Sequence, residues 1–250
     1  MRQLRSLGTL GALLLLGMAT LARAQEIDGK VILRQIDDLY RGQSSVARTT
    51  MHIKTEHWER SLEMQVYSKG MERSLVRIVR PKQEEGTATL KVEGNIWNYL
   101  PKTRRVMKIP ASLMMGSWMG SHFTNDDLVQ RSRLEEDYDF ELEDLAETER
   151  WRITLVPHED APVVWGKIVI ELQKQPLLPV WMEYYDEDGE AVRRSTYEDV
   201  QTVSDRTLPL KLRMVPLEAP DEFTEIHYRE VRFDVELDDD LFSLQALKRR

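Results

Sequence analysis

The chain has 250 residues, a formal net charge of −8 and no cysteine. Without cysteine there is no disulfide framework, so a hydrophobic core must hold the fold. The excess of acidic residues argues against nucleic acid as a partner. Because the acids are spread along most of the chain, simple electrostatic attachment to anionic lipid is also disfavoured.

The N-terminus has the pattern of a cleavable secretory signal. Arg2 and Arg5 precede an apolar stretch of about a dozen residues, shorter than the roughly 20 that span a bilayer. Small residues at positions 22–24 then offer a cleavage site, so residues 1–24 are predicted to be removed. These residues hold three arginines and no acid, so the remaining chain, residues 25–250, carries a net charge of −11.

The mature chain is predicted to be a single soluble domain in the periplasm. Its expected first residue is Gln25, and lipidation at a new N-terminus would require a cysteine there. No internal repeat, low-complexity tract or linker divides residues 25–250. An exported protein that is neither anchored nor lipidated is therefore expected.

One amphipathic helix is predicted over residues 27–41, where apolar positions recur at helical spacing until Gly42. After it, short runs of β-branched and aromatic residues alternate with turn signals, as in an antiparallel sheet of about ten to twelve strands. Tight hairpins are expected at Lys69-Gly70, Gly94-Asn95 and Asp188-Gly189, because these pairs supply positive φ angles.

Few helices are available to cover the apolar face of such a sheet. They are the N-terminal helix, a broken helical region over residues 111–131, and a short helix after the acidic residues 238–240. A strongly twisted sheet of this size tends to curl. We therefore expect a mainly β (α+β) fold, a curled antiparallel sheet forming an incomplete barrel with a partly unfilled apolar hollow. Two sheets packed face to face would give the same alternation.

No motif indicates catalysis, a metal site or a cofactor. His52 and His57 are five residues apart, beside a predicted strand, and are expected at the surface rather than as paired zinc ligands. The remaining histidines are isolated in sequence, so a catalytic site assembled in space has no support from spacing. Runs of acids such as residues 238–240 more often cap helices than bind cations.

The segment over residues 106–123 is rich in methionine. Such side chains are flexible and polarisable, so a cluster of them suits varied apolar ligands. The segment is interpreted as a mobile lid over the hollow that accepts acyl chains, or as an ordinary loop that closes the core. A Cu(I) site using methionines and His122 is a disfavoured third interpretation. The candidate ligand-binding residues here are Met107, Met114, Met115, Trp118, Met119 and Phe123.

Aromatic residues in strand-like runs are candidates for lining the same hollow. Trp97 and Tyr99 are the two taken as candidate ligand contacts, with Trp165 and Trp181 in similar positions. A single tryptophan in a strand is otherwise plain core filling.

Residues 74–128 contain two recognisable motifs. The first is a W-x-Y-L-P-x-x-x-R-V stretch, and its residues are Trp97, Tyr99, Leu100, Pro101, Arg105 and Val106. The second is a G-S-x-F-x-x-x-D-L element, and its residues are Gly120, Ser121, Phe123, Asp127 and Leu128. Both motifs, and the end of the chain from Leu208 to Phe242, resemble those of the periplasmic outer-membrane lipoprotein-sorting, or LolA-like, family. In that family the second motif commonly reads G-S-D-F-x-x-x-D-L, with Asp at the position of His122.

The resemblance implies an incomplete antiparallel barrel whose apolar cavity takes up acyl chains of lipoproteins or lipids and carries them toward the outer membrane. It also implies an arginine inside the barrel that holds a lid shut through backbone carbonyls, which the sequence does not match to a position. An inner-membrane transporter and an outer-membrane acceptor are the partners it suggests.

Two other functions compete with a carrier. The same fold would serve as a binding or sensor module, or as an accessory subunit of a membrane transporter, with its apolar groove docking a partner. A hydrolase with a site built from scattered residues is disfavoured, since no catalytic constellation is recognised.

Overall fold

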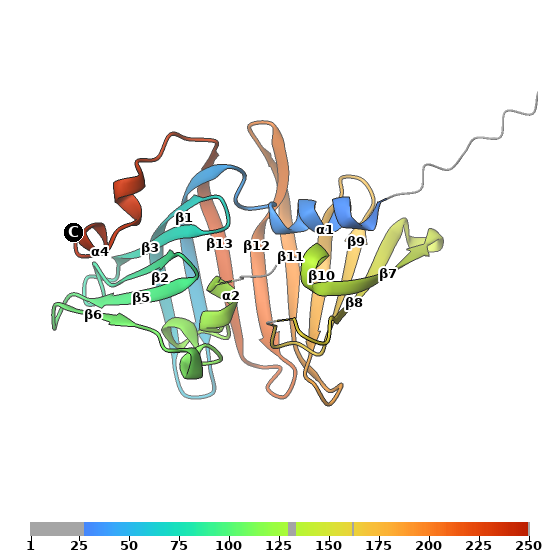
Figure 1. Ribbon diagram of the computed structural model, residues 1–250, viewed down its shortest axis with the longest axis horizontal. Helices are drawn as coiled ribbons and strands as arrows, with labels where there is room; N and C mark the ends of the chain where they lie inside the picture. The colour runs from blue at the N-terminus through green and yellow to red at the C-terminus, as the bar shows by residue number, and fades with distance from the viewer. Residues whose placement is uncertain (1–27, 130–133, 162, 250) are drawn as a thin grey trace, which may run out of the picture.

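One continuous antiparallel sheet of thirteen strands forms most of the molecule (Figure 1). The computed structural model describes residues 28–129, 134–161 and 163–249. The predicted signal lies outside the described residues. The strands are β1 (Ser44–Lys54), β2 (Glu59–Lys69), β3 (Arg73–Arg80), β4 (Ala88–Val92), β5 (Asn95–Leu100), β6 (Arg105–Lys108), β7 (Tyr138–Leu145), β8 (Arg150–Pro157), β9 (Lys167–Gln173), β10 (Leu178–Tyr185), β11 (Ala191–Val203), β12 (Arg206–Pro216) and β13 (Phe223–Phe233).

Helical elements are short and few among the described residues. The α-helices are α1 (Gly29–Asp37), α2 (Asn125–Val129), α3 (Leu134–Asp137) and α4 (Leu244–Leu247). Single 3-10 turns are η1 (Ala111–Leu113), η2 (Trp118–Gly120), η3 (Ala146–Thr148) and η4 (Asp239–Phe242). No helix in the described part of the chain is long and apolar enough to span a membrane.

The order of the strands follows the chain except at one junction. Strands β6 to β1 lie in sequence, β1 then pairs with β13, and the order continues down to β7. The first and last strands of the chain, β1 and β13, therefore meet in the middle, and β6 and β7 are the two edges (Figure 1). This confirms the expected curled sheet that is not closed into a barrel, and a sandwich of two sheets was the wrong alternative.

The hairpins form where the turn residues predicted them. Gly70, Gly94 and Gly189 all have positive φ angles, at 58°, 66° and 83°. The strand count of thirteen exceeds the ten to twelve expected, because an element as short as β6, with four residues, is too brief to show alternation.

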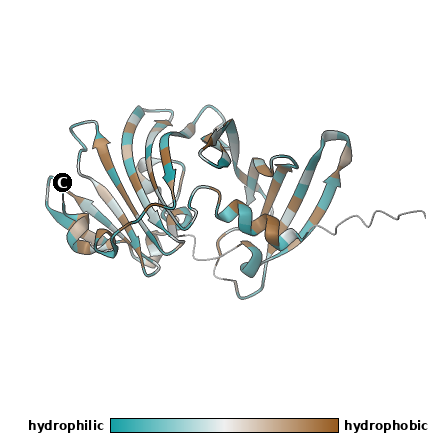
Figure 2. Ribbon diagram, turned by 90° about the horizontal axis from the view of Figure 1, so that it is seen from above, coloured by the Kyte–Doolittle hydropathy of each residue, from teal (hydrophilic) through white to brown (hydrophobic). Residues whose placement is uncertain are grey.

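The two faces of the sheet are covered by different ends of the chain. Helix α1 buries Ile32 and Leu33 in an apolar cluster with strands β8 to β10, and Figure 2 shows this helix across the open side of the bent sheet. Its first turn is capped by Asp28, whose carboxylate accepts from the Lys30 N–H at 3.0 Å. The C-terminal segment instead packs Phe242 and Leu247 against the outer face of β3 and β4.

The predicted C-terminal cap is present. Asp238 is the N-cap residue of η4, and its carboxylate accepts a hydrogen bond from the Asp240 N–H at 2.9 Å. Helix α4 follows η4 in the chain. The helical region expected over residues 111–131 consists of η1, η2 and α2 over its described part, since glycines at 116 and 120 interrupt it.

Candidate functional site

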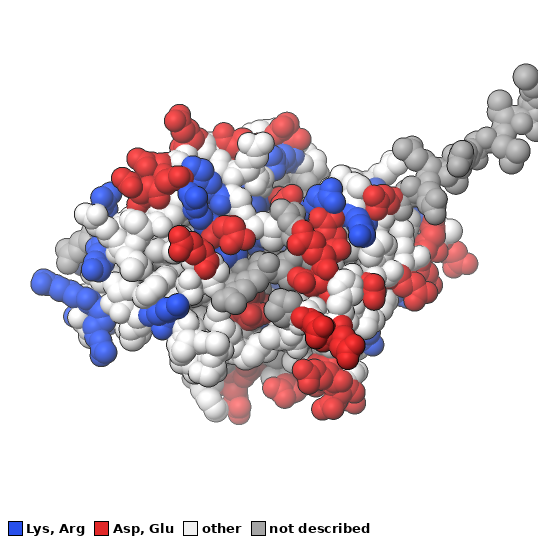
Figure 3. Space-filling view, viewed as in Figure 1, with Lys and Arg blue, Asp and Glu red and all other residues white. Residues whose placement is uncertain are grey.

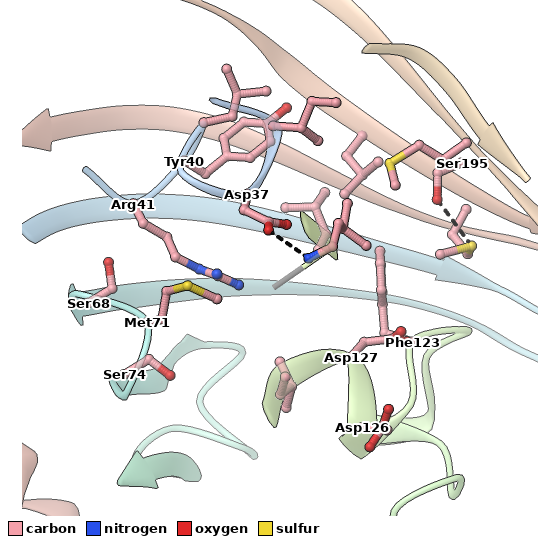
Figure 4. Close-up of a pocket in the computed structure, with 18 of the residues that line it drawn as sticks. Asp37, Tyr40, Arg41, Ser68, Met71, Ser74, Phe123, Asp126, Asp127 and Ser195 are labelled. Atoms are coloured by element: carbon pink, nitrogen blue, oxygen red, sulfur yellow. Dashed lines mark hydrogen bonds between the residues drawn. The ribbon is translucent and has the colours of Figure 1, made fainter. Parts of the chain in front are cut away.

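A cavity of about 370 Å³ lies between the inner face of the sheet and the segments that cross it. This volume is within the range of small-molecule and lipid-chain pockets. The turn after α1 contributes Tyr40 and Arg41 to one wall (Figure 4). Trp118, Phe123 and α2 contribute another. The sheet supplies the floor through inward-facing residues, among them Ala47, Val66, Met182, Tyr184, Ser195, Tyr197, Leu212, Met214, Ile226 and Tyr228.

Most polar groups on the floor are bonded to other protein atoms. The buried hydroxyls of Ser45 and Ser68 lie 2.7 Å apart, and the Ser195 hydroxyl contacts the Met214 sulfur at 3.4 Å (Figure 4). The Tyr197 hydroxyl donates to the sulfur of Met182 at 2.8 Å. The floor therefore offers an adaptable, weakly polar surface of methionine and aromatic side chains, which suits an apolar ligand better than a polar one.

Three tyrosines of the floor remain uncharged at neutral pH. Burial raises the pKa of Tyr184 and Tyr228 to about 12, and it raises the pKa of Tyr197 well above its ordinary value. The ring of Tyr228 stacks on Tyr40 at a centroid distance of 4.8 Å. The aromatic part of the cavity thus keeps an apolar character over the physiological pH range.

A closing segment, which we define as residues 109–129, crosses the open side of this floor. Its Trp118 is only 3% exposed, lines the cavity and donates its indole N–H to the Thr89 hydroxyl at 3.1 Å. Phe123 also lines the cavity, and Met119 packs on the apolar cluster around Met51 and Leu62. The tryptophan ties the closing segment to strand β4 at one end of the cavity.

Arg193 of β11 holds the other end of the closing segment. Its guanidinium makes two hydrogen bonds to the Asp127 carboxylate, at 2.7 and 2.5 Å, and a longer one to the His122 carbonyl at 3.3 Å. The side chain is 5% exposed and lies against the rings of Trp165 and Tyr184. Burial alone lowers the pKa of Arg193, but the bonds and charge of Asp127 outweigh it and raise the pKa, so the pair stays ionised.

A second arginine contacts the same segment. Arg60 of β2 donates to the backbone carbonyl of Met119 and forms an ion pair with Glu84 at 3.4 Å. Two arginines from the sheet thus reach carbonyls of the closing segment. The sequence alone did not identify either one, although an interior arginine of this kind was implied by the family resemblance.

The structure separates the eight candidate ligand contacts into three groups. Trp118 and Phe123 line the cavity, with Met119 beside them. Met114 is half-buried outside the cavity wall, whereas Met107 and Met115 are 37% and 49% exposed. Trp97 and Tyr99 pack with the cluster around Phe242, on the face of the sheet opposite the cavity.

The floor residues were missed because no motif marks them. They occupy alternate positions of central strands, for example Ser195 and Tyr197 of β11, or Ile226 and Tyr228 of β13. The alternation of these strands was visible in the sequence. The choice of which face lines the hollow required knowing which side the closing segment covers.

One histidine has partners that resemble a catalytic triad. His122 contacts the Thr224 hydroxyl through Nδ1 at 2.9 Å and Glu222 through Nε2 at 3.1 Å. Thr224 is 0% exposed, and its oxygen also accepts the His122 N–H. A substrate has no access to that hydroxyl, so the arrangement anchors the closing segment to β13. His52 pairs with Glu59 and His57 is largely exposed, as expected for surface residues.

Among the described residues, no group of three or more histidine, cysteine, aspartate or glutamate side chains is arranged to hold a metal ion. The acidic residues of the cavity are bonded to the protein itself. Asp37 accepts the Leu134 N–H at 3.1 Å (Figure 4), and Asp127 accepts the Thr124 N–H at 2.7 Å besides its pair with Arg193. The geometry is that of a cavity closed by polar ties.

The chain is similar to several solved structures over most of its length. Each of three matches aligns 88% of this chain. The first is a DUF1329 family protein from Desulfovibrio piger, with 23% identity, a TM-score of 0.76 and 97% of that chain aligned. The second is a putative outer membrane lipoprotein-sorting protein domain from Vibrio parahaemolyticus, with 22% identity, a TM-score of 0.73 and 98% aligned, and the third is a LolA superfamily protein from Nitrosomonas europaea, with 20% identity, a TM-score of 0.71 and 99% aligned. No curated protein matches the sequence.

A family model described as "Uncharacterized protein" matches residues 70–249, which is more than half of the chain. The solved structures share the strand arrangement at low identity and therefore establish the fold. The chain belongs to the family that this model describes, and its fold is the LolA-like fold.

Proposed function

We propose that this protein is a periplasmic carrier that takes acyl chains of lipoproteins or lipids into the cavity and moves them toward the outer membrane. The observation that carries the proposal is a largely apolar cavity closed by a segment that two sheet arginines hold in place. The LolA-like fold supports it, because the similar structures include a lipoprotein-sorting domain.

The energies of loading and closure are compatible with reversible binding. Burying one methylene group contributes about 0.8 kcal/mol, so ten methylenes contribute about 8 kcal/mol. Opening the closing segment separates Arg193 from Asp127 but returns both charges to water, so it costs less than the about 3 to 5 kcal/mol lost when one partner of a buried pair is removed. Burial of an acyl chain of this length therefore offsets the opening of the closing segment.

Within the closed cavity, the proposed cargo contacts are Trp118, Met119 and Phe123 on the closing segment. Met114, Met115 and Met107 lie outward of it and join the binding surface only when the segment moves away from the sheet. No cargo contact is proposed for Trp97 or Tyr99, because the C-terminal segment covers them. The proposed function involves no covalent catalysis.

The test is uptake of a diacylated lipopeptide by the chain without its predicted signal, measured as lipopeptide that co-elutes with protein. Ala47 is 3% exposed and lines the cavity floor, so Ala47→Phe would fill part of the volume that cargo needs. Its neighbour Val46 faces the other side of β1. We expect Ala47→Phe to lower uptake at least tenfold, an estimate that corresponds to roughly two buried methylenes, and Val46→Phe to leave it unchanged. Equal uptake by both variants would contradict the assignment of the cavity.

A further inference from the structure

A thirty-one-residue stretch of this acidic chain contains no acid at all. Residues 95–125 include no aspartate or glutamate, although about five would be expected at the average of 43 acids in 250 residues. The same stretch holds Lys102, Arg104, Arg105 and Lys108. Counting charges over the whole chain hides this local reversal of sign.

The four cations lie on the β5–β6 hairpin, at the edge of the sheet. All four residues are exposed, and no ion-pair partner is found for any of them among the residues that the structure describes. Lys108 also lies 5.7 Å from the centre of the Trp97 ring. Figure 3 shows blue side chains at the end of the molecule where Figure 1 places this hairpin. The adjoining β3–β4 loop, with Gly86 close to Pro101, adds Lys82, Glu84 and Glu85, and Glu84 forms an ion pair with Arg60.

Exposed apolar side chains lie in the same acid-free stretch of the chain. Met107, Leu113 and Met115 are 37%, 55% and 49% exposed. The buried Asn125 side chain donates to the carbonyls of Leu113 and Gly116, both at 3.0 Å. The loop that presents these apolar side chains to solvent is therefore fixed by hydrogen bonds, and their exposure is a property of the fold.

The opposite edge of the sheet has the reverse character. Strand β7 carries Asp139, Glu141, Glu143 and Asp144 and no base. The molecule thus has a basic, partly apolar end at β6 and an acidic end at β7. Near an anionic surface, this polarity would turn the β6 end toward the surface.

We propose that the basic, apolar end, defined by Lys102, Arg104, Arg105, Lys108, Met107, Leu113 and Met115, docks on the surface of an anionic phospholipid bilayer. Cations next to protruding apolar side chains match such a surface, where lipid phosphates attract the cations and the acyl boundary accepts the apolar groups. An acidic protein with apolar side chains of its own is the competing occupant, and the vesicle experiment below separates it from a bilayer. The proposal departs from the expectation, drawn from the charge of the whole chain, that simple electrostatic attachment to lipid is disfavoured.

The docking surface is continuous in sequence with the closing segment of the cavity. Leu113 and Met115 lie in the same loop as Trp118, which reaches the cavity wall. Contact of that loop with a bilayer would place the closing segment beside the lipid. This inference goes beyond the proposed carrier function and does not require it, since a sensor or accessory module with this surface would dock in the same way.

The experiment is co-sedimentation of the chain without its predicted signal with vesicles of phosphatidylcholine, with and without phosphatidylglycerol. One Lys or Arg near an anionic surface strengthens binding by about fivefold, so reversing three weakens it by roughly 100-fold or more. We expect this loss for K102E/R104E/R105E and, more weakly, for the neutral K102Q/R104Q/R105Q. The matched control K54E/R229E/R232E, which changes exposed residues of β1 and β13, should bind as the original chain does.

The apolar contribution is measured separately. Binding to the vesicles should fall in high salt, which screens the cations. The binding that remains in high salt should be lost in the L113S/M115S variant. Docked protein pellets with the vesicles, whereas a carrier that has extracted lipid remains in the supernatant, so the two functions fail independently. Equal binding to both kinds of vesicle, equal losses in the control variant, or no binding to either vesicle would overturn the proposal. The last result would turn the search for a partner of this surface to acidic proteins.

Discussion

The tie between Arg193 and Asp127 can be tested by removing the arginine. In Arg193→Met, the half-buried carboxylate of Asp127 loses two charge-assisted hydrogen bonds but keeps the one from the Thr124 N–H. Removing one partner of a buried pair costs about 3 to 5 kcal/mol. Asp127 is 21% exposed and can turn toward water, so the lower value, about 3 kcal/mol, applies.

The loss should appear in local opening of the closing segment. A change of about 3 kcal/mol corresponds to roughly a 10²-fold fall in amide exchange protection. We expect this fall for the amides of α2 and η2, measured by hydrogen–deuterium exchange with mass spectrometry, while the central strands change little. A double-mutant cycle with Asp127→Asn should give a coupling energy of about 1 to 3 kcal/mol.

Arg194 provides a matched control. It follows Arg193 on β11, faces the other side of the sheet and pairs with Glu183. Arg194→Met removes a comparable guanidinium, yet exchange in the closing segment should not change. If Arg193→Met leaves that exchange unaltered, or if both variants accelerate it equally, the arginine does not hold the segment closed.

Three further results are expected. Trp118→Phe removes a buried indole hydrogen bond and should lower the free energy of unfolding by about 1 kcal/mol in urea denaturation. The pKa of Glu222 is lowered by the Glu56 N–H and by His122, so this contribution to stability exists above the unfolded pKa and is lost as pH falls. Glu222→Gln should therefore flatten the acid limb of the stability profile. Burial raises the pKa of Tyr228 to about 12, so stability should fall from about pH 10, the unfolded value, upward, and Tyr228→Phe should reduce that fall.

The sequence predicted the sheet well because its signals are local. The glycines at 70, 94 and 189 permit the positive φ angles that tight turns need, and they form the expected hairpins. The helix over residues 27–41 was also predicted, although the structure ends α1 at Asp37. Strand β6 was harder to recognise, because four residues contain too little alternation to distinguish a strand from a loop.

The site was predicted only in part because it depends on pairing between distant strands. Methionine content drew attention to the closing segment, where Trp118 and Phe123 do line the cavity. The same criterion could not show that Met115 points outward, since a loop has no periodicity. Arg193 lies 66 residues from Asp127 in the chain, and only the crossing of α2 over β11 brings them together.

Native mass spectrometry of the protein purified after export, followed by organic extraction, tests the central claim most directly. The carrier account predicts a bound lipid or acylated peptide, or an added mass after incubation with either one, and predicts that Ala47→Phe loses it. A mass equal to that of the bare chain, unchanged by phospholipid and lipopeptide, would contradict the account. The cavity would then belong to a docking or sensor module.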